Sequence, residues 1–227
     1  DDSAFIRQNF TKREVMIPMR DGKKLFTAIY TPKDAKGSYP VLLKRTPYSC
    51  SPYGEKEFVT RLQNMYLARS GYIWVFQDVR GSYMSEGDFV DVRPFNPNKQ
   101  TPQDIDESSD TYDTVDWLLK NTPANNGRVG VYGISYPGFY ATMAVLAGHP
   151  AIKAVSPQAP VTDWFIGDDF HHNGAFMLMD AFSFYSGFGK PRPKPTTESA
   201  KGFEDWKTPD NYDFYLRAGA LRNYAEK

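Results

Sequence analysis

The feature that most constrains the fold of this chain is the alternation of short apolar runs with segments of helical spacing. Each apolar run has the length of a strand that is buried on both faces, and such strands occur in parallel sheets covered by helices. The apolar runs occupy residues 40–45, 72–77, 128–132 and 152–155, and the helical segments occupy residues 58–68, 110–119 and 138–147. The sequence therefore predicts an α/β domain with a mostly parallel sheet and helices on both faces.

Two further stretches define the extent of this domain. At its start, two alternating apolar runs separated by a turn predict an antiparallel hairpin over residues 12–30. Later the strand pattern fades: residues 164–186 are rich in Phe, Met and Gly, and a proline-rich loop follows at 190–197. We therefore assign residues 1–160 to the α/β domain and interpret residues 161–227 as a helical insertion, the start of a cap.

The composition excludes several classes of function. Among 227 residues, 27 Lys and Arg balance 27 Asp and Glu, so the chain lacks the surplus of basic residues that nucleic-acid binding requires. Hydrophobic residues make up 41% of the chain, enough for a sizeable core, and no apolar run predicts a membrane anchor. The single cysteine, Cys50, leaves the redox compartment open. We expect neither a metal nor another cofactor.

The N-terminal residues are relevant to the cellular compartment of the protein. The chain opens with Asp1-Asp2-Ser3 and shows neither the basic segment nor the apolar run of a signal peptide. This start fits the mature end of a processed precursor or a trimmed chain. We expect a periplasmic or secreted location, with the cytoplasm as the alternative. At the other end, the helical character of residues 212–217 predicts that the chain stops inside a larger fold.

The strongest chemical signal is the segment GISYPG at residues 133–138, between a predicted strand and a predicted helix. In a nucleophile elbow, a serine at such a turn projects its hydroxyl away from the sheet, while small neighbours let the backbones cross closely. The helix that follows directs N–H groups toward a developing oxyanion. Here Pro137 fills the fifth position of the usual G-x-S-x-G pattern, and Gly138 comes one later. We predict Ser135 as a nucleophile, with a tight turn closed by a capping serine as the alternative.

A serine nucleophile needs a general base, and in this class of fold the triad order is Ser, then an acid, then His. The histidines of this chain are His149, His171 and His172. They follow Ser135 too closely in sequence, because two further strands normally separate nucleophile and base. We therefore expect none of them to be the base, and we predict solvated or capping roles for His171 and His172.

Several motifs occur in one order along nearly the whole chain. They are Arg45-Thr46-Pro47-Tyr48, Asp78-Val79-Arg80-Gly81, Ser85-Glu86-Gly87, Asp113-Thr114-Val115-Asp116-Trp117, Gly127-Arg128-Val129-Gly130, the elbow at 133–138, Gly167-Asp168-Asp169-Phe170 and Gly174-Ala175-Phe176. Together they resemble the N-terminal part of the α-amino acid ester hydrolases, β-lactam acylases related to glutaryl-7-aminocephalosporanic acid acylase, cocaine esterase and X-Pro dipeptidyl-peptidase. The resemblance implies the N-terminal part of an α/β-hydrolase fold, followed by the start of a helical cap.

The resemblance also implies roles for four residues. Ser135 would be the acylating nucleophile, the backbone N–H of Tyr136 one oxyanion donor, and the hydroxyl of Tyr48 the second. Asp169 would belong to a carboxylate cluster that binds the α-ammonium group of the substrate. Without the resemblance, Tyr48 would be interpreted as a buried structural tyrosine, and Asp169 as an N-cap or a surface ion pair. Asp168 is easily confused with its neighbour.

These roles imply a serine hydrolase or acyltransferase that acts on esters or amides of α-amino acids, including β-lactam acyl groups, through an acyl-enzyme on Ser135. A relative with glutaryl, plain ester or X-Pro preference is the alternative enzyme, and a non-catalytic module is the alternative outside enzymes. Members of the family continue to the triad Asp and His and to a C-terminal β-sandwich, so we expect this chain to be incomplete and inactive alone. We expect a small-molecule ester or amide as partner, and a homo-oligomer for the full-length protein.

The other charged residues favour structural roles. Asp78, Arg80 and Glu86 follow a central strand, and such a combination predicts an ion-pair network that fixes a loop. The acidic run over residues 104–116 predicts a solvated helix face whose acids lie near the helix N-terminus. A calcium site there lacks support, because the run has neither the glycine nor the ligand spacing of an EF-hand loop.

Overall fold

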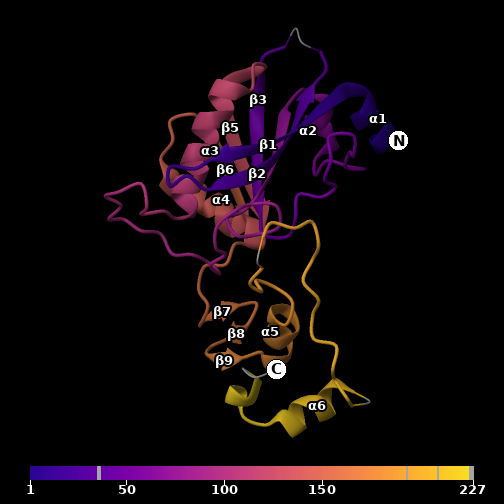
Figure 1. The fold of residues 1–227 in the computed structure, drawn as a ribbon, viewed down its shortest axis with the longest axis vertical. Helices are drawn as coiled ribbons and strands as arrows, with labels where there is room; N and C mark the ends of the chain where they lie inside the picture. Colours follow the sequence, from indigo (N-terminus) through magenta and orange to yellow (C-terminus); the bar gives the residue numbers. More distant parts are fainter. Residues whose placement is uncertain (35–36, 193, 209, 225–227) are drawn as a thin grey trace. The chain divides into compact units, whose positions relative to one another are not determined.

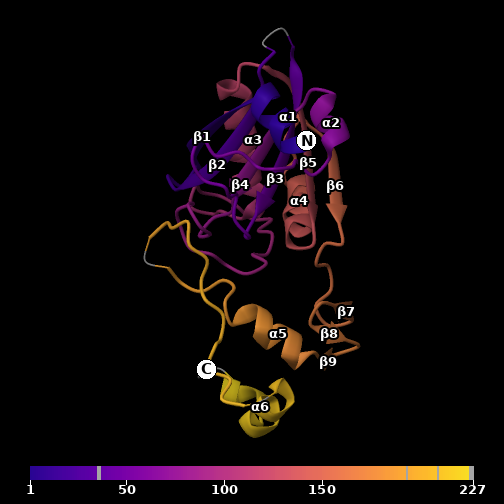
Figure 2. The same cartoon turned by 90° about the vertical axis from the view of Figure 1, so that its right-hand side faces the viewer.

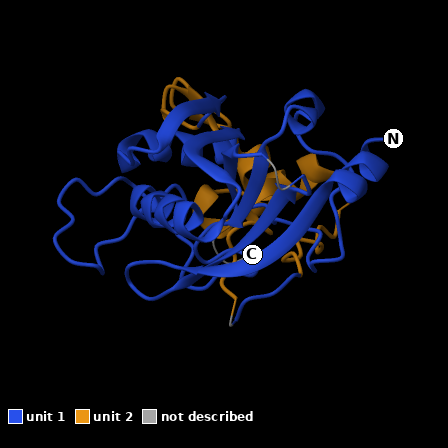
Figure 3. Ribbon diagram, turned by 90° about the horizontal axis from the view of Figure 1, so that it is seen from above, with its two compact units in different colours: residues 1–160, 193–197 blue, residues 161–192, 198–227 orange. Residues whose placement is uncertain are grey.

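The computed structural model describes residues 1–34, 37–192, 194–208 and 210–224. The chain divides into two compact units, residues 1–160 with 193–197 and residues 161–192 with 198–227 (Figure 3). Pro193, which falls in the predicted proline-rich loop, lies outside the described residues, as does the end of the predicted cap segment at residues 225–227.

The first unit is built on a six-stranded sheet (Figure 1), in which the strands follow the order β1-β2-β4-β3-β5-β6. β1 and β2 form the predicted antiparallel hairpin, and β2 is also antiparallel to β4. The neighbours β4, β3, β5 and β6 all run parallel, which confirms the mostly parallel sheet. The strands are β1 (Phe10–Pro18), β2 (Lys24–Pro32), β3 (Tyr39–Thr46), β4 (Ile73–Asp78), β5 (Asn125–Ile134) and β6 (Ile152–Gln158).

Helices cover both faces of this sheet (Figure 2). On one face, α3 (Glu107–Asn121) and α4 (Tyr136–Ala147) pack on the strands in a continuous apolar core. On the other face, α1 (Asp2–Asn9) and α2 (Met65–Arg69) join a second core around Trp74. The sequence did not predict α1, because an eight-residue helix that buries a single residue shows no apolar periodicity.

The predicted helix over residues 58–68 is wrong for most of its length, since only Met65–Arg69 is helical. Asn64 begins that helix by accepting a backbone N–H in its first turn at 3.0 Å. In the segment just before the predicted helix, a buried lysine binds the backbone. The Lys12 ammonium donates at 2.6, 3.0 and 2.9 Å to the carbonyls of Pro52, Gly54 and Glu57. Because these carbonyls have a partner, residues 52–57 can follow an irregular path that leads into the non-helical stretch before Asn64.

The prediction that the acidic run at 104–116 is a solvated face is wrong for Asp106, Glu107 and Asp110, which are buried. The acids do lie near the helix N-terminus, as expected, and Asp116 is half exposed. Glu107 and Asp110 are at most 3% exposed. They pair at 3.0 and 3.7 Å with Arg45, which is the next-to-last residue of β3, and Asp110 also pairs with Arg80 at 2.7 Å. Arg45 itself was the available signal, because a guanidinium inside a buried strand requires buried carboxylates. This cluster joins the end of β3 to the first turn of α3.

The second unit combines a small sheet with two helices. Its strands are two residues long and antiparallel, in the order β7-β8-β9, and the sequence did not predict them. Aromatic side chains form much of its interior, with Phe182 in contact with both Phe214 and Tyr224. The elements are β7 (Gly167–Asp168), β8 (His171–His172), β9 (Ala175–Phe176), α5 (Leu178–Tyr185), α6 (Asn211–Ala218) and a 3₁₀ turn at Leu221–Tyr224.

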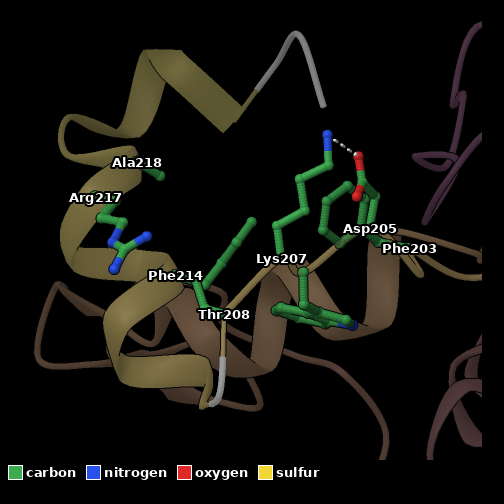
Figure 4. Close-up of a pocket in the computed structure, with 8 residues that line it drawn as sticks. Phe203, Asp205, Lys207, Thr208, Phe214, Arg217 and Ala218 are labelled. Carbon is green, nitrogen blue, oxygen red and sulfur yellow. Dashed lines mark ion pairs between the residues drawn. The ribbon is translucent and has the colours of Figure 1, made fainter.

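A pocket of about 440 Å³ opens beside α6 in this unit (Figure 4). Trp206 and Phe214 form part of its wall, and an ion pair of 3.1 Å between Lys207 and Asp205 lies at its side. Across the described ranges of both units, no helix has the length and apolar character needed to cross a membrane.

Candidate active site

Ser135 lies in the turn between β5 and α4, and its backbone angles are rare for a serine, with φ 62° and ψ −126°. Glycines flank the turn because a side chain would not fit. A Cβ on Gly133 would overlap the carbonyl of Pro137, and one on Gly138 would come within 2.6 Å of the Gln158 carbonyl oxygen. β5 has a strand on each side, with β3 and β6 as its neighbours. A strained serine after an interior strand, held by close backbone packing, is the geometry of a nucleophile elbow.

The alternative of a capping serine does not hold. Ser135 is the N-cap residue of α4, yet its hydroxyl makes no capping hydrogen bond. Backbone groups complete the turn instead: the N–H of Ser135 donates to the Gln158 carbonyl at 2.9 Å, and its carbonyl accepts the N–H of Gly138 at 2.8 Å. Tyr136 is the first residue of α4, where N–H groups have no partner within a helix and the dipole is positive. Negative charge that develops beside Ser135 would therefore be stabilised.

Tyr48 follows β3, and β3 is the parallel neighbour of β5, so both strands end at the same edge of the sheet. The ring of Tyr48 meets the ring of Tyr136 edge-on, with centroids 6.2 Å apart. Tyr48 is 43% exposed, so the interpretation as a buried structural tyrosine is wrong. Its backbone N–H is fixed by Thr46 Oγ1 at 3.0 Å. The fold thus brings Tyr48 into contact with the residue that follows Ser135.

The side chain of Tyr136 connects the elbow to the loop before α3. Its hydroxyl donates to Asp91 Oδ1 at 2.6 Å and accepts the N–H of Val92 at 2.6 Å, while its ring stacks on Tyr140. Burial raises the pKa of Tyr136 far above the usual tyrosine value, so this hydroxyl stays protonated. Sequence reasoning predicted a role only for the backbone of Tyr136, because nothing local links it to a loop 45 residues away.

The predicted ion-pair network of Asp78, Arg80 and Glu86 is wrong for two of its members, because among the described residues only Arg80 of the three makes ion pairs. All three nevertheless fix the loop, through partners outside this group. Arg80 pairs with Asp110 and with Asp21, both at 2.7 Å. Glu86 accepts a backbone N–H from the first residue of β2 at 2.9 Å. Asp78 is fully buried and accepts hydrogen bonds from neutral groups. The loop after β4 is therefore anchored to α3, to β2 and to the loop after β3.

His149, the histidine of the first unit, is too far from Ser135 to be its base. His149 lies just past the end of α4, about 18 Å along a twelve-residue helix from Ser135. Its Nδ1 accepts a backbone N–H at 3.1 Å, and burial lowers its pKa. The other two form β8 of the second unit. His171 packs on Phe176 with ring centroids 5.1 Å apart rather than being solvated, whereas His172 is exposed as expected.

Asp169 lies in the turn between β7 and β8 of the second unit and is exposed. Its neighbour Asp168 holds this turn together by accepting the N–H of Thr162 at 3.2 Å and the N–H of Asp169 at 2.7 Å. Among the residues that the structure describes, Asp169 caps no helix and makes no ion pair. The two adjacent aspartates are thus distinct: Asp168 has a local structural role, and Asp169 faces solvent.

In the described part of the chain, no group of three or more His, Cys, Asp or Glu side chains is placed to hold a metal ion. In the acidic run that was considered for calcium, Glu107 and Asp110 are already neutralised by Arg45 and Arg80. The lone thiol of Cys50 is buried.

Comparison with known proteins places the chain in a family. Residues 21–224 match the X-Pro dipeptidyl-peptidase (S15) family. The chain belongs to this family. An α-amino acid ester hydrolase of known structure is 40% identical, with a TM-score of 0.81 over 96% of this chain and 35% of that protein. An aminopeptidase from a marine sediment archaeon, Thaumarchaeota archaeon, is 38% identical with the same TM-score and coverage.

Cocaine esterase from Rhodococcus sp. (strain MB1 Bresler) is also similar to this S15 chain, with 35% identity over 165 residues. The match covers 72% of this chain but 26% of the esterase. The S15 chain therefore spans only part of the length of each relative. The likeness to the α-amino acid ester hydrolase confirms the resemblance found in the motifs and shows the α/β-hydrolase fold.

Proposed function

We propose that this S15 chain carries the nucleophile and the oxyanion donors of a serine hydrolase or acyltransferase that acts on esters or amides of α-amino acids, β-lactam acyl groups among them. The observation that carries the proposal is the strained turn at Ser135, whose hydroxyl is not used as a cap and stands at a helix N-terminus. The substrate class is supported by the relative named as an α-amino acid ester hydrolase, which is 40% identical.

In the proposed reaction, Ser135 Oγ attacks the acyl carbonyl and gives its proton to a general base. The N–H of Tyr136 and the hydroxyl of Tyr48 stabilise the negative carbonyl oxygen. The bond to the leaving group then breaks as that group takes up the proton, and water or an amine releases the acyl group from Ser135. His149 is held at the far end of α4, and His171 and His172 follow Ser135 too closely in sequence. We therefore infer that the base comes from the part of the relatives' length that this chain does not span.

Labelling of the complete protein with a fluorophosphonate tests this proposal. The probe reacts with an activated serine, so we expect a single adduct on Ser135 in peptide mapping and parallel loss of hydrolysis. The chain of 227 residues alone should react far more slowly, because we expect the base to lie outside it. Hydrolysis that survives complete labelling, or an adduct on another serine, would reject Ser135 as nucleophile. A complete protein that neither reacts with the probe nor hydrolyses esters would favour the non-catalytic module.

Tyr48→Phe should lower kcat of the complete protein by about 10²-fold, the usual effect of removing one oxyanion-hole donor. The change removes only the hydroxyl, and the ring contact with Tyr136 remains. Steady-state kinetics should show little change in KM, and thermal unfolding should show little change in stability. Tyr212→Phe, which removes the hydroxyl of a tyrosine on α6 that is 72% exposed, is the matched control. An unchanged kcat for Tyr48→Phe would return Tyr48 to a structural role.

Asp169→Asn should weaken the use of α-amino acyl esters by at least about tenfold in kcat/KM, because only these substrates lose a charge-assisted contact. Matched esters without the amine should change little. Asp163→Asn serves as control, because this exposed carboxylate of the same unit holds its own turn by accepting two backbone N–H groups. Equal losses for both ester series would favour the alternative enzymes, with glutaryl, plain ester or X-Pro preference.

A further inference from the structure

The last residue of β4, Asp78, is a buried carboxylate at the edge of the sheet where Ser135 lies. Asp78 is 0% exposed, and its partner across the parallel pairing is Thr46, the last residue of β3. The loop that carries Tyr48 begins directly after Thr46, so Asp78 lies beneath this loop. The reaction proposed above gives Asp78 no part.

The carboxylate of Asp78 binds the Tyr48 loop at two points and the loop after β4 at a third. Asp78 Oδ1 accepts the N–H of Cys50 at 2.7 Å, and Oδ2 accepts the hydroxyl of Tyr53 at 2.9 Å. Oδ2 also accepts the N–H of Met84 at 3.2 Å. One side chain thus fixes two loops at the edge of the active site.

The position of Tyr48 depends on this arrangement. Tyr48 is two residues before Cys50, and the residue between them, Ser49, has a positive φ of 88° that a serine rarely adopts. The hydroxyls of Ser49 and Tyr53 are 2.9 Å apart, so the hydrogen bonds continue from Asp78 through Tyr53 to the strained residue. Such a conformation persists only where surrounding contacts impose it.

The type of side chain supports a specific role. Among the residues described, Asp78 makes no ion pair, and burial raises its pKa. Packing alone would be served better by a neutral side chain, because a buried carboxyl without a cation is unfavourable. What a carboxylate provides here is acceptor capacity for several donors that converge from two loops.

We propose that Asp78 is a positioning residue for Tyr48: it acts on the reaction by holding the loop that aims the Tyr48 hydroxyl at the oxyanion. The inference rests on the proposed function, in which Tyr48 is an oxyanion donor. It predicts that Asp78 and Tyr48 contribute to turnover through one shared effect.

Kinetics of four forms of the complete protein test this inference: the unaltered protein, Asp78→Asn, Tyr48→Phe and the double variant. Asp78→Asn keeps the shape of the side chain but replaces an acceptor oxygen by a donor. We expect kcat to fall between about 10- and 100-fold with KM little changed, because small misplacements of a catalytic group have effects of this size. When Asp78→Asn is added to Tyr48→Phe, kcat of the double variant should be less than about twofold below that of Tyr48→Phe alone.

Two further variants keep the test decisive. Tyr53→Phe removes one donor to Asp78 and leaves the carboxylate in place. It therefore replaces Asp78→Asn if that variant does not fold. Tyr53→Phe should lower kcat when the Tyr48 hydroxyl is present and leave kcat unchanged in the Tyr48→Phe protein. Glu14→Gln is the matched control, because Glu14 accepts the N–H of Gly54 at 2.7 Å, farther along the segment that follows Tyr48. We expect Glu14→Gln to change stability without a coupled change in kcat.

The outcomes separate this inference from the proposed function. Equal losses of kcat in the presence and absence of the Tyr48 hydroxyl, or an Asp78→Asn variant with unchanged kcat, would overturn the role of Asp78 while Ser135 and Tyr48 keep theirs. If Tyr48→Phe itself has no effect, the role of Tyr48 and this inference both fall. Loss of kcat that is coupled to Tyr48 in both the Asp78 and the Tyr53 variants supports the inference.

Discussion

Ser135→Ala should reduce hydrolysis of an α-amino acid ester by the complete protein by about 10⁴-fold or more, because the proposed reaction passes through an acyl-enzyme on Ser135. What remains would come from binding and from the oxyanion donors. The hydroxyl of Ser135 makes no capping hydrogen bond, so its removal takes away no structural contact of that kind. We therefore expect unchanged thermal unfolding together with the loss of turnover, measured by steady-state kinetics on the same preparation.

Ser156→Ala is the control for this variant. Ser156 is an exposed serine on β6, next to β5 in the sheet, and it accepts a hydrogen bond from Gln158 at 3.2 Å. A chemically identical change there should leave kcat/KM unchanged. If Ser135→Ala keeps most of its activity while Ser156→Ala behaves as expected, the proposed mechanism is wrong, whatever the fold implies.

Asp110→Ala should lower the free energy of unfolding by about 3–5 kcal/mol, the range for breaking a buried ion pair from one side. Asp110 is 1% exposed and accepts two hydrogen bonds from Arg80, at 2.9 and 2.7 Å. It also lies 3.7 Å from Arg45. Removing Asp110 leaves two buried guanidinium groups with fewer partners, and water cannot replace the lost charge. Urea unfolding measures the change.

Asp116→Ala on the same helix is the matched control. Asp116 pairs with Lys120 at 2.7 Å, but its side chain is 46% exposed. Pairs in water contribute little because solvent screens them, so we expect a change within about 0.5 kcal/mol. Equal losses for Asp110→Ala and Asp116→Ala would show that helix propensity in α3, and not the buried charge cluster, determines the effect.

The parts of this molecule that the sequence predicts well are those that short segments determine. The elbow needs a serine between small residues at the junction of a strand and a helix, and all of these occur within residues 133–138. The parallel strands are continuous apolar runs. Such a run can be recognised in the sequence without knowing the register in which the strand pairs. Tyr48 is different, because its role comes from the family resemblance, and its own spacing indicates no chemistry.

Partners that are distant in sequence could not be predicted. Lys12 binds the carbonyls of the irregular segment at residues 52–57, and no local pattern shows that an ammonium from β1 reaches them. The acids of α3 look solvated until Arg45 of β3 is placed beside them. The same limit applies to the hydroxyl of Tyr136, which donates to Asp91 in an irregular loop. In each case one long polar side chain changes the environment of a segment far away.

The backbone bond between Ser135 and Gln158 has a consequence for folding kinetics. The N–H of Ser135 donates to the last residue of β6, and β6 follows the elbow in sequence. The strained angles of Ser135 therefore gain their support only after β6 has paired with β5. β5 in turn pairs with β3, which is distant in sequence, and such non-local pairing is slow. We expect the reactive turn to form late in refolding, and pulsed hydrogen exchange should show the Ser135 amide protected after those of the β1–β2 hairpin.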